Sequence, residues 1–196
     1  VAMYYATYYL GVPDFAGAFN SAGLAASIVS MVASTWITQR YCKMKLFRQS
    51  QIAVLFISLL MYFVVQPGDV MTAFVLYIIL SFVVDLHAPV FWSAIAEAVD
   101  YGEIKDGVRA SGLSFGGISF CQKAGGGLAG LAGGLLLAFF EYKPNVEQTE
   151  FPLMGLALML TIIPGVFHAL LGLILKKYKI TDEYYTDMVI HKRLPK

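Results

Sequence analysis

Hydrophobic residues occur in long runs along this chain, and short polar segments separate the runs. Five runs approach or exceed the roughly 20 residues that a helix needs to cross a bilayer. They cover residues 15–38, 47–65, 70–96, 110–140 and 152–175. A sixth apolar stretch, residues 1–12, is shorter and starts at the first residue. The pattern predicts an all-α membrane protein with six transmembrane helices, and we expect the first to be the end of a longer helix in a larger protein.

Composition supports this interpretation. Hydrophobic residues make up 58% of the chain and charged residues 14%, and the mean hydropathy is +0.68. Soluble domains are about half apolar and about one quarter charged. We therefore expect a six-helix bundle over residues 1–176 and a polar tail over residues 177–196, with the lipid bilayer as a partner and no nucleic-acid partner.

Basic residues are concentrated on one side of the predicted topology. Loops 39–48 and 97–109 and the tail contain twelve of the 14 lysines and arginines: Arg40, Lys43, Lys45, Arg48, Lys105, Arg109, Lys176, Lys177, Lys179, Lys192, Arg193 and Lys196. The loops on the opposite side contain Lys143 alone. Because Lys and Arg accumulate in cytoplasmic loops, we expect the basic loops and the C-terminus to be cytoplasmic. Loops 66–69 and 141–151 are then external.

Two charged residues fall deep inside predicted helices. Lys123 follows Arg109 by 14 residues, which is roughly 21 Å along a helix from the cytoplasmic end. Asp85 precedes Glu97 by 12 residues, or roughly 18 Å from the same side. A charge at the bilayer centre costs about 2.5–3.5 kcal/mol, so such residues face a bundle interior or a wet cavity. Lys123 therefore either pairs with Asp85, as a structural ion pair, or points into a central cavity, which is the arrangement we expect.

Helical spacing brings further side chains beside these charges. Asp85, Pro89 and Trp92 lie at positions i, i+4 and i+7 and share one helix face. Ser119 lies one turn before Lys123 on the same face. Charged groups, a hydroxyl and an aromatic plate suit a sugar, whose ring stacks and whose hydroxyls form hydrogen bonds. We therefore predict that Lys123, Ser119, Trp92 and Asp85 bind substrate or couple it to a cation, with anchoring at the membrane interface as the alternative for Trp92.

The histidines and glycines of the predicted helices indicate packing. His87 lies nearly opposite Asp85 on its helix, and we expect it, like His168, to be packed or hydrogen-bonded. Gly126, Gly130 and Gly134 repeat every four residues, which is the pattern that lets membrane helices approach closely.

Acidic residues recur at the end of the fourth predicted helix. Glu97, Asp100 and Glu103 are spaced by three, which stacks them on one side of a helix end; an ordinary solvated loop is the alternative. They belong to a longer pattern made of Pro89, Trp92, Asp100-Tyr101-Gly102-Glu103, Lys105, Gly107, Arg109 and Lys123-Ala124-Gly125.

This pattern resembles that of the glycoside–pentoside–hexuronide:cation symporters, and residues 142–148 are similar to an outer loop of that family. The resemblance implies a twelve-helix major facilitator fold, in which this chain supplies helices 7–12 and the N-terminal half is its partner. It also implies that Lys123 couples the sugar and cation sites. It further implies that the acids at the helix end form gate ion pairs, for which Arg40 is a candidate partner.

The function expected from these features is cation-coupled transport of a sugar or glycoside by alternating access across a bacterial inner membrane. The resemblance implies that sodium or a proton binds mainly in the N-terminal half, and we expect no cofactor, metal site or catalytic residue. An intramembrane enzyme is the first alternative, but it needs a nucleophile or metal cluster that the sequence does not suggest. A non-transporting membrane scaffold is the second.

Overall fold

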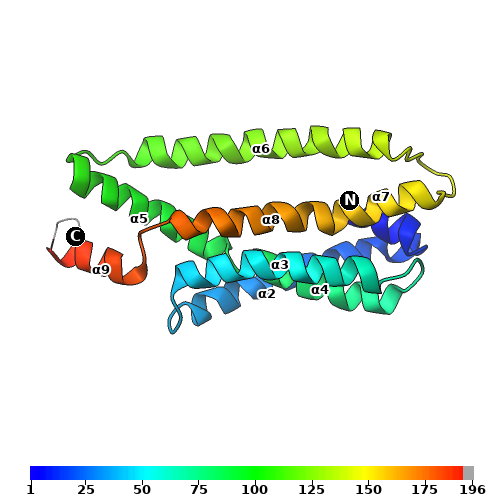
Figure 1. Cartoon of the computed structure of the whole chain (residues 1–196), viewed down its shortest axis with the longest axis horizontal. Coiled ribbons are helices and arrows are strands. Elements are labelled where there is room, and N and C mark those ends of the chain that lie inside the picture. The colour runs from blue at the N-terminus through cyan, green and yellow to red at the C-terminus, as the bar shows by residue number, and fades with distance from the viewer. Residues whose placement is uncertain (192–196) are drawn as a thin grey trace.

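The computed structural model describes residues 1–191, and every regular element in that range is a helix. Figure 1 shows the longer helices lying side by side along one long axis. These helices are α2 (Ala16–Ile37), α3 (Lys43–Val64), α4 (Val70–Asp85), α5 (Ala88–Asp106), α6 (Ser111–Phe139), α7 (Glu150–Leu160) and α8 (Ile162–Ile174). The shorter elements are α1 (Ala2–Tyr4), the π-helix η1 (Tyr5–Tyr9), the 3₁₀ helices η2 (Pro13–Phe15) and η3 (Leu175–Lys177), and α9 (Asp182–His191).

Four helical stretches are long and apolar enough to cross a membrane. They are Pro13–Ile37, Lys43–Val64, Val70–Asp106 and Glu150–His191. The protein is therefore an all-helical membrane protein, but the predicted count of six spans is not established. Helix α6 is 29 residues long yet lies outside this set, because its glycines and Lys123 lower its hydropathy.

Two of these stretches contain a break that the hydrophobic pattern did not reveal. The predicted helix over residues 70–96 is divided into α4 and α5, with Pro89 in the first turn of α5. Proline has no backbone N–H and clashes with the preceding turn, so it ends or bends a helix. The last stretch is divided at Thr161 between α7 and α8.

The core lies among η1, α2, α3, α4 and α7, and α8 packs against α3. The most extensive contacts join α3 to α8 and α2 to α4, and the buried side chains between the helices include Phe19, Val54, Met61 and Leu80. Glycines permit the close approaches. A Cβ at Gly172 would lie 3.0 Å from Ile52 of α3, and one at Gly23 would lie 2.6 Å from Tyr77 of α4.

Helix α6 stands apart from this core. None of its residues is buried, and its main contacts are with α5 and α7, as the separate green helix in Figure 1 shows. A Cβ at Gly126, Gly130 or Gly134 would meet no atom within 4 Å. The close helix packing predicted for this glycine face therefore does not occur among the described residues.

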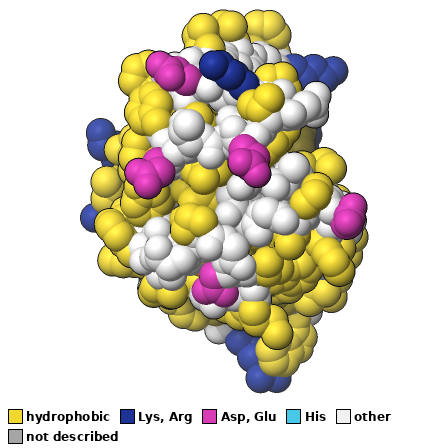
Figure 2. Space-filling view, turned by 90° about the vertical axis from the view of Figure 1, so that its right-hand side faces the viewer, with side chains coloured by type: hydrophobic (Ala, Val, Ile, Leu, Met, Phe, Trp, Pro, Cys, Tyr) yellow, Lys and Arg dark blue, Asp and Glu magenta, His cyan; other side chains and the backbone are white. Residues whose placement is uncertain are grey.

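The two ends of the bundle differ in charge. One end, called the basic end below, contains the loop between α2 and α3, the end of α5 and helix α9. The opposite end, called the acidic end, is viewed in Figure 2, where acidic side chains are spread over the face. The acids of that end are Asp14, Asp69, Glu141, Glu147 and Glu150.

Candidate functional site at the basic end

A buried carboxylate and a lysine form the centre of an ion-pair cluster at the basic end. Glu97 lies on the inner face of α5 and is only 4% exposed. The ammonium of Lys43, the first residue of α3, contacts Glu97 Oε1. The hydroxyl of Ser93, one turn earlier on α5, donates to the same oxygen at 3.2 Å. The other oxygen, Oε2, has no hydrogen-bond partner among the described residues, so Glu97 depends heavily on Lys43.

A second, more exposed group involves the other two predicted acids. Gly107 ends α5 in the left-handed conformation, at φ 73°, which glycine adopts without a steric cost. The chain turns there, and Arg109 Nη1 lies 2.8 Å from Asp100 Oδ1 and 2.5 Å from Glu103 Oε2. The hydrogen bonds that Arg109 donates to Glu103 and Asp100 raise the pKa of Arg109 above its ordinary value. Solvent screens exposed pairs of this kind, so each contributes little to stability.

Helix α9 connects the two groups. Asp182, its first residue, accepts a hydrogen bond from the backbone N–H of Lys43 at 3.1 Å, and its Oδ1 lies 3.1 Å from the Lys43 ammonium. The Tyr185 hydroxyl donates to Asp100 Oδ2 at 2.6 Å, and Met188 is fully buried. The basic-end cluster therefore consists of Lys43, Glu97, Asp100, Glu103, Arg109 and Asp182, and it joins α3, α5 and α9.

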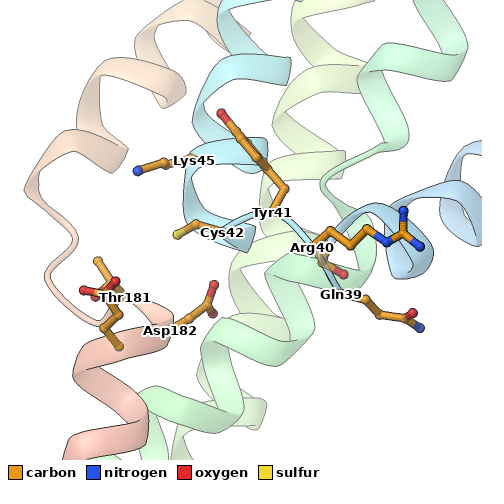
Figure 3. Close-up of a pocket in the computed structure, with 9 residues that line it drawn as sticks. Gln39, Arg40, Tyr41, Cys42, Lys45, Thr181 and Asp182 are labelled. Carbon is orange, nitrogen blue, oxygen red and sulfur yellow. The ribbon is translucent and has the colours of Figure 1, made fainter.

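Arg40, the basic residue expected to pair with these acids, forms no ion pair among residues 1–191. Its guanidinium lies over the Trp36 ring, 5.3 Å from the centroid. Figure 3 shows Arg40 pointing away from Asp182, across a cavity of about 430 Å³ between the α2–α3 loop and α9. Sequence reasoning did not identify Lys43 or Asp182 as members of the cluster. The sequence feature that could have identified Lys43 as a member is its position at the start of an apolar run.

The residues predicted to line a substrate site lie on three helices, α4, α5 and α6. Asp85 is the last residue of α4 and is half-buried. Lys123 is exposed on α6, and Ser119 is half-buried one turn before it. Within the part of the chain that the structure describes, neither Lys123 nor Asp85 takes part in an ion pair. The direct pair considered from the sequence is therefore not formed here.

Trp92 lies between α5 and α6. Its ring is nearly parallel to that of Phe115 on α6, with centroids 6.4 Å apart, and it meets Phe91 edge-on at 5.4 Å. The indole is 44% exposed. Its geometry suits stacking against a further ring, and a role in sugar binding stays a prediction.

Comparison with known proteins gives the family. The model of the MFS/sugar transport protein family matches residues 1–182. The inner membrane symporter YicJ of Escherichia coli (strain K12) is 29% identical over 90% of this chain and 38% of its own length. The uncharacterized symporter YnaJ of Bacillus subtilis (strain 168) is 32% identical over 96% of this chain and 41% of its own length.

A third relative, the putative glycoside/cation symporter YagG of Escherichia coli (strain K12), is 29% identical over 92% of this chain and 39% of its own length. The chain thus spans about two fifths of the length of these relatives. The resemblance drawn from the acidic motif and the membrane lysine is confirmed. The chain belongs to the MFS/sugar transport protein family, and it is an integral membrane protein.

Proposed function

We propose that this chain forms the C-terminal half of a transporter that carries a sugar or glycoside together with a cation across the inner membrane. Support comes from the family and from the printed name of one relative, a putative glycoside/cation symporter. The observation that carries the proposal is the basic-end cluster, because its acids are those of the symporter-like motif.

The basic-end cluster acts as one side of a gate in this mechanism. Its ion pairs hold α3, α5 and α9 together, and the gate opens when the cluster releases its contacts with the other half. Alternating access needs two states of similar free energy, so a few pairs of modest strength are sufficient to shift the balance. The basic end is the cytoplasmic end, following the positive-inside rule, and the C-terminus is therefore cytoplasmic.

Lys123 couples the two substrates in this proposal. It lies on α6, a long helix none of whose residues is buried. An ammonium at this depth requires an acidic or polar partner. In this proposal the partner is an acid of the N-terminal half, toward which α6 presents Lys123. That half supplies the main cation site.

Flux measurement with the full-length protein tests the function. Purified transporter in proteoliposomes should accumulate a labelled glycoside when a sodium or proton gradient is imposed, and accumulation should collapse with the gradient. Failure to accumulate any sugar from a panel of glycosides, pentosides and hexuronides, under either gradient, would favour the alternative of a non-transporting scaffold.

A second experiment tests the gate. Glu97→Gln should shift the full-length protein toward the state open at the basic end, because Lys43 loses its buried counter-charge. A single cysteine at Ala98, which is exposed on α5, should then react faster with a water-soluble maleimide. Asp106→Asn, on the same helix, exposed and outside the ion pairs of the described residues, serves as the matched control and should change the rate little. Equal rates in all three proteins would exclude Glu97 from the gate.

A further inference from the structure

Two histidines lie next to each other where α4 gives way to α5. His87 occupies the break itself, and His168 lies on α8. Their ring centroids are 6.5 Å apart, with the planes at 70°. The His87 ring also stacks on Phe47 of α3, at 4.9 Å. Both histidines are half-buried and hydrogen-bonded, so the prediction that they are packed and bonded is confirmed.

The hydrogen bonds determine the tautomer of each ring. His87 Nδ1 lies 2.5 Å from the carbonyl oxygen of Val84, and His168 Nδ1 lies 2.5 Å from the amide oxygen of Gln51, a fully buried residue. Both oxygens can only accept, so each Nδ1 carries the hydrogen. The Nε2 lone pair of each neutral ring is therefore free to accept a proton. Neither Nε2 has a hydrogen-bond partner among residues 1–191.

The charged groups around the pair are few. Helix α2 has no ionisable side chain, and α8 has none besides His168. Helix α3 places its basic residues near its start, where Arg48 is one turn from Gln51. Helix α4 contributes Tyr77 and Asp85, and the acids of α5 begin at Glu97. The ionisable groups that act on His168 are His87 and Asp85.

We propose that His87, His168 and Asp85 form a proton-binding site in this half of the transporter. One proton binds at the Nε2 of either imidazole, and the charge of the first opposes a second proton on the other ring. Asp85 supplies the negative charge that an imidazolium in a membrane interior requires. Imidazole is suited to this role because its ordinary pKa, about 6.5, is the closest of any side chain to neutral pH.

The site is attached to the broken helix. Ser30 and Ser34, both fully buried on α2, donate hydrogen bonds to the carbonyls of Phe82 and Leu86 at 2.5 and 2.6 Å. His87 binds the third carbonyl, that of Val84. A charged imidazolium donates a stronger hydrogen bond than a neutral ring, so the bound proton stiffens the connection to α5, which bears Glu97. This last step rests on the proposed transport function, whereas the proton site itself does not.

Titration of the histidines tests the site directly. The full-length protein is labelled with ¹⁵N-histidine, and the resonances are assigned with His87→Asn and His168→Asn. Asparagine does not titrate, and its amide N–H can keep the bond made by Nδ1. The shifts are followed between pH 4 and 9, and we expect them to report protonation of the His87–His168 pair. Removing either ring should let the other bind the proton more readily, because the repulsion between the two rings is lost.

Two further variants sharpen the titration. Asp85→Asn should make His168 harder to protonate, because the favourable negative charge is removed. His191→Asn, in α9 and remote from the pair, should leave both midpoints unchanged. Rings that stay neutral throughout the range, or midpoints that do not respond to loss of the partner, would overturn the proposal.

The pH profile of uptake then tests the link to α5. At fixed sugar and cation gradients, His87→Asn and His168→Asn should flatten the dependence of the initial rate between pH 5.5 and 8 at least twofold. The His191→Asn protein should retain the wild-type profile. Unchanged profiles in both variants would overturn the link to α5. A wild-type protein without uptake would instead overturn the proposed function, and the titration would still decide the proton site.

Discussion

Single side chains at the basic end show what the sequence predicts well and what it leaves open. Glu97, Asp100 and Glu103 were predicted to form ion pairs, and each contacts a basic residue. The partners were harder to predict, because a loop of a few residues decides which basic side chain faces inward. Arg40 stacks on Trp36 instead, and Lys43 is left to face Glu97.

Replacement of Lys43 by alanine should be strongly destabilising. It leaves the carboxylate of Glu97, only 4% exposed, without its cation. Removing one partner of a buried pair costs about 3–5 kcal/mol, and we expect the lower part of that range because Lys43 is partly exposed. Thermal or denaturant unfolding of the full-length protein in detergent measures the change.

Lys45 provides the matched control for this substitution. It lies on the same helix, two residues further on, and forms no ion pair among the described residues. Lys45→Ala should change the free energy of unfolding by less than about 0.5 kcal/mol. The double variant Lys43→Ala with Glu97→Gln should recover much of the free energy of unfolding that Lys43→Ala loses. A double variant as unstable as Lys43→Ala would contradict the pairing.

The prediction for the coupling of sugar and cation concerns Lys123. Lys123→Ala should abolish gradient-driven accumulation in the full-length transporter while leaving exchange of sugar down its own gradient measurable, because coupling needs the charge. Lys143→Ala, which removes the other isolated lysine from a loop, should leave accumulation intact. Asp85→Asn should change the apparent sugar affinity more than the coupling. Full accumulation by Lys123→Ala would remove this residue from the mechanism.

The broken element between α4 and α5 illustrates the limits of reading single helices. Pro89 signals a perturbation in the sequence, and the apolar run alone continues past it. The carbonyls that the break frees, and the groups that bind them, depend on a neighbouring helix. Ser30 and Ser34 of α2 reach carbonyls 52 residues away in sequence. Such contacts are set by tertiary packing, which periodicity does not report.

Ser34→Ala should lower the free energy of unfolding measurably. The Leu86 carbonyl would lose its donor in a buried, apolar setting, at a cost of about 1–2 kcal/mol. Ser27→Ala on the same helix is the control, because its hydroxyl binds the carbonyl of Gly23 within α2 and leaves a helix acceptor still bonded. Thermal unfolding of both proteins compares them. Equal destabilisation would show that the break does not depend on α2.

Helix α6 gives a second example at the same scale. Its glycine face at Gly126, Gly130 and Gly134 has the spacing of a close helix contact, yet no atom lies close enough. Close contacts occur instead at isolated glycines such as Gly165 and Gly172, where α8 meets α3. A repeat in the sequence therefore shows that a helix can be approached closely, and the location of the partner is a separate question.

Over the whole molecule, the two ends carry opposite charge, as the distribution of basic residues predicted. The acidic end has Asp69 capping α4, where its side chain accepts from the Thr72 N–H, and it has Lys143 in the loop before α7. Three residues that also contributed to the predicted asymmetry lie outside the described residues: Lys192, Arg193 and Lys196. The helical class and the basic end followed from the sequence, whereas the count of six spans stays a prediction.

The orientation in the membrane follows from this asymmetry and is the last prediction. Because basic loops remain in the cytoplasm, residues at the acidic end should be external. Position 147 is suitable for a label, since Glu147 is exposed and does not have the positive φ of Asn145, 61°. The starting protein should have Cys42 and Cys121 replaced by serine.

In that background, Glu147→Cys should react in intact cells with a membrane-impermeant maleimide. Lys179→Cys, exposed at the basic end, should react only after the membrane is permeabilised. Both positions lie outside the helices, and they lie at opposite ends of the bundle. Each therefore serves as the control for the other. Labelling of position 179 in intact cells, with position 147 protected until permeabilisation, would reverse the orientation and place the basic-end cluster at the external gate.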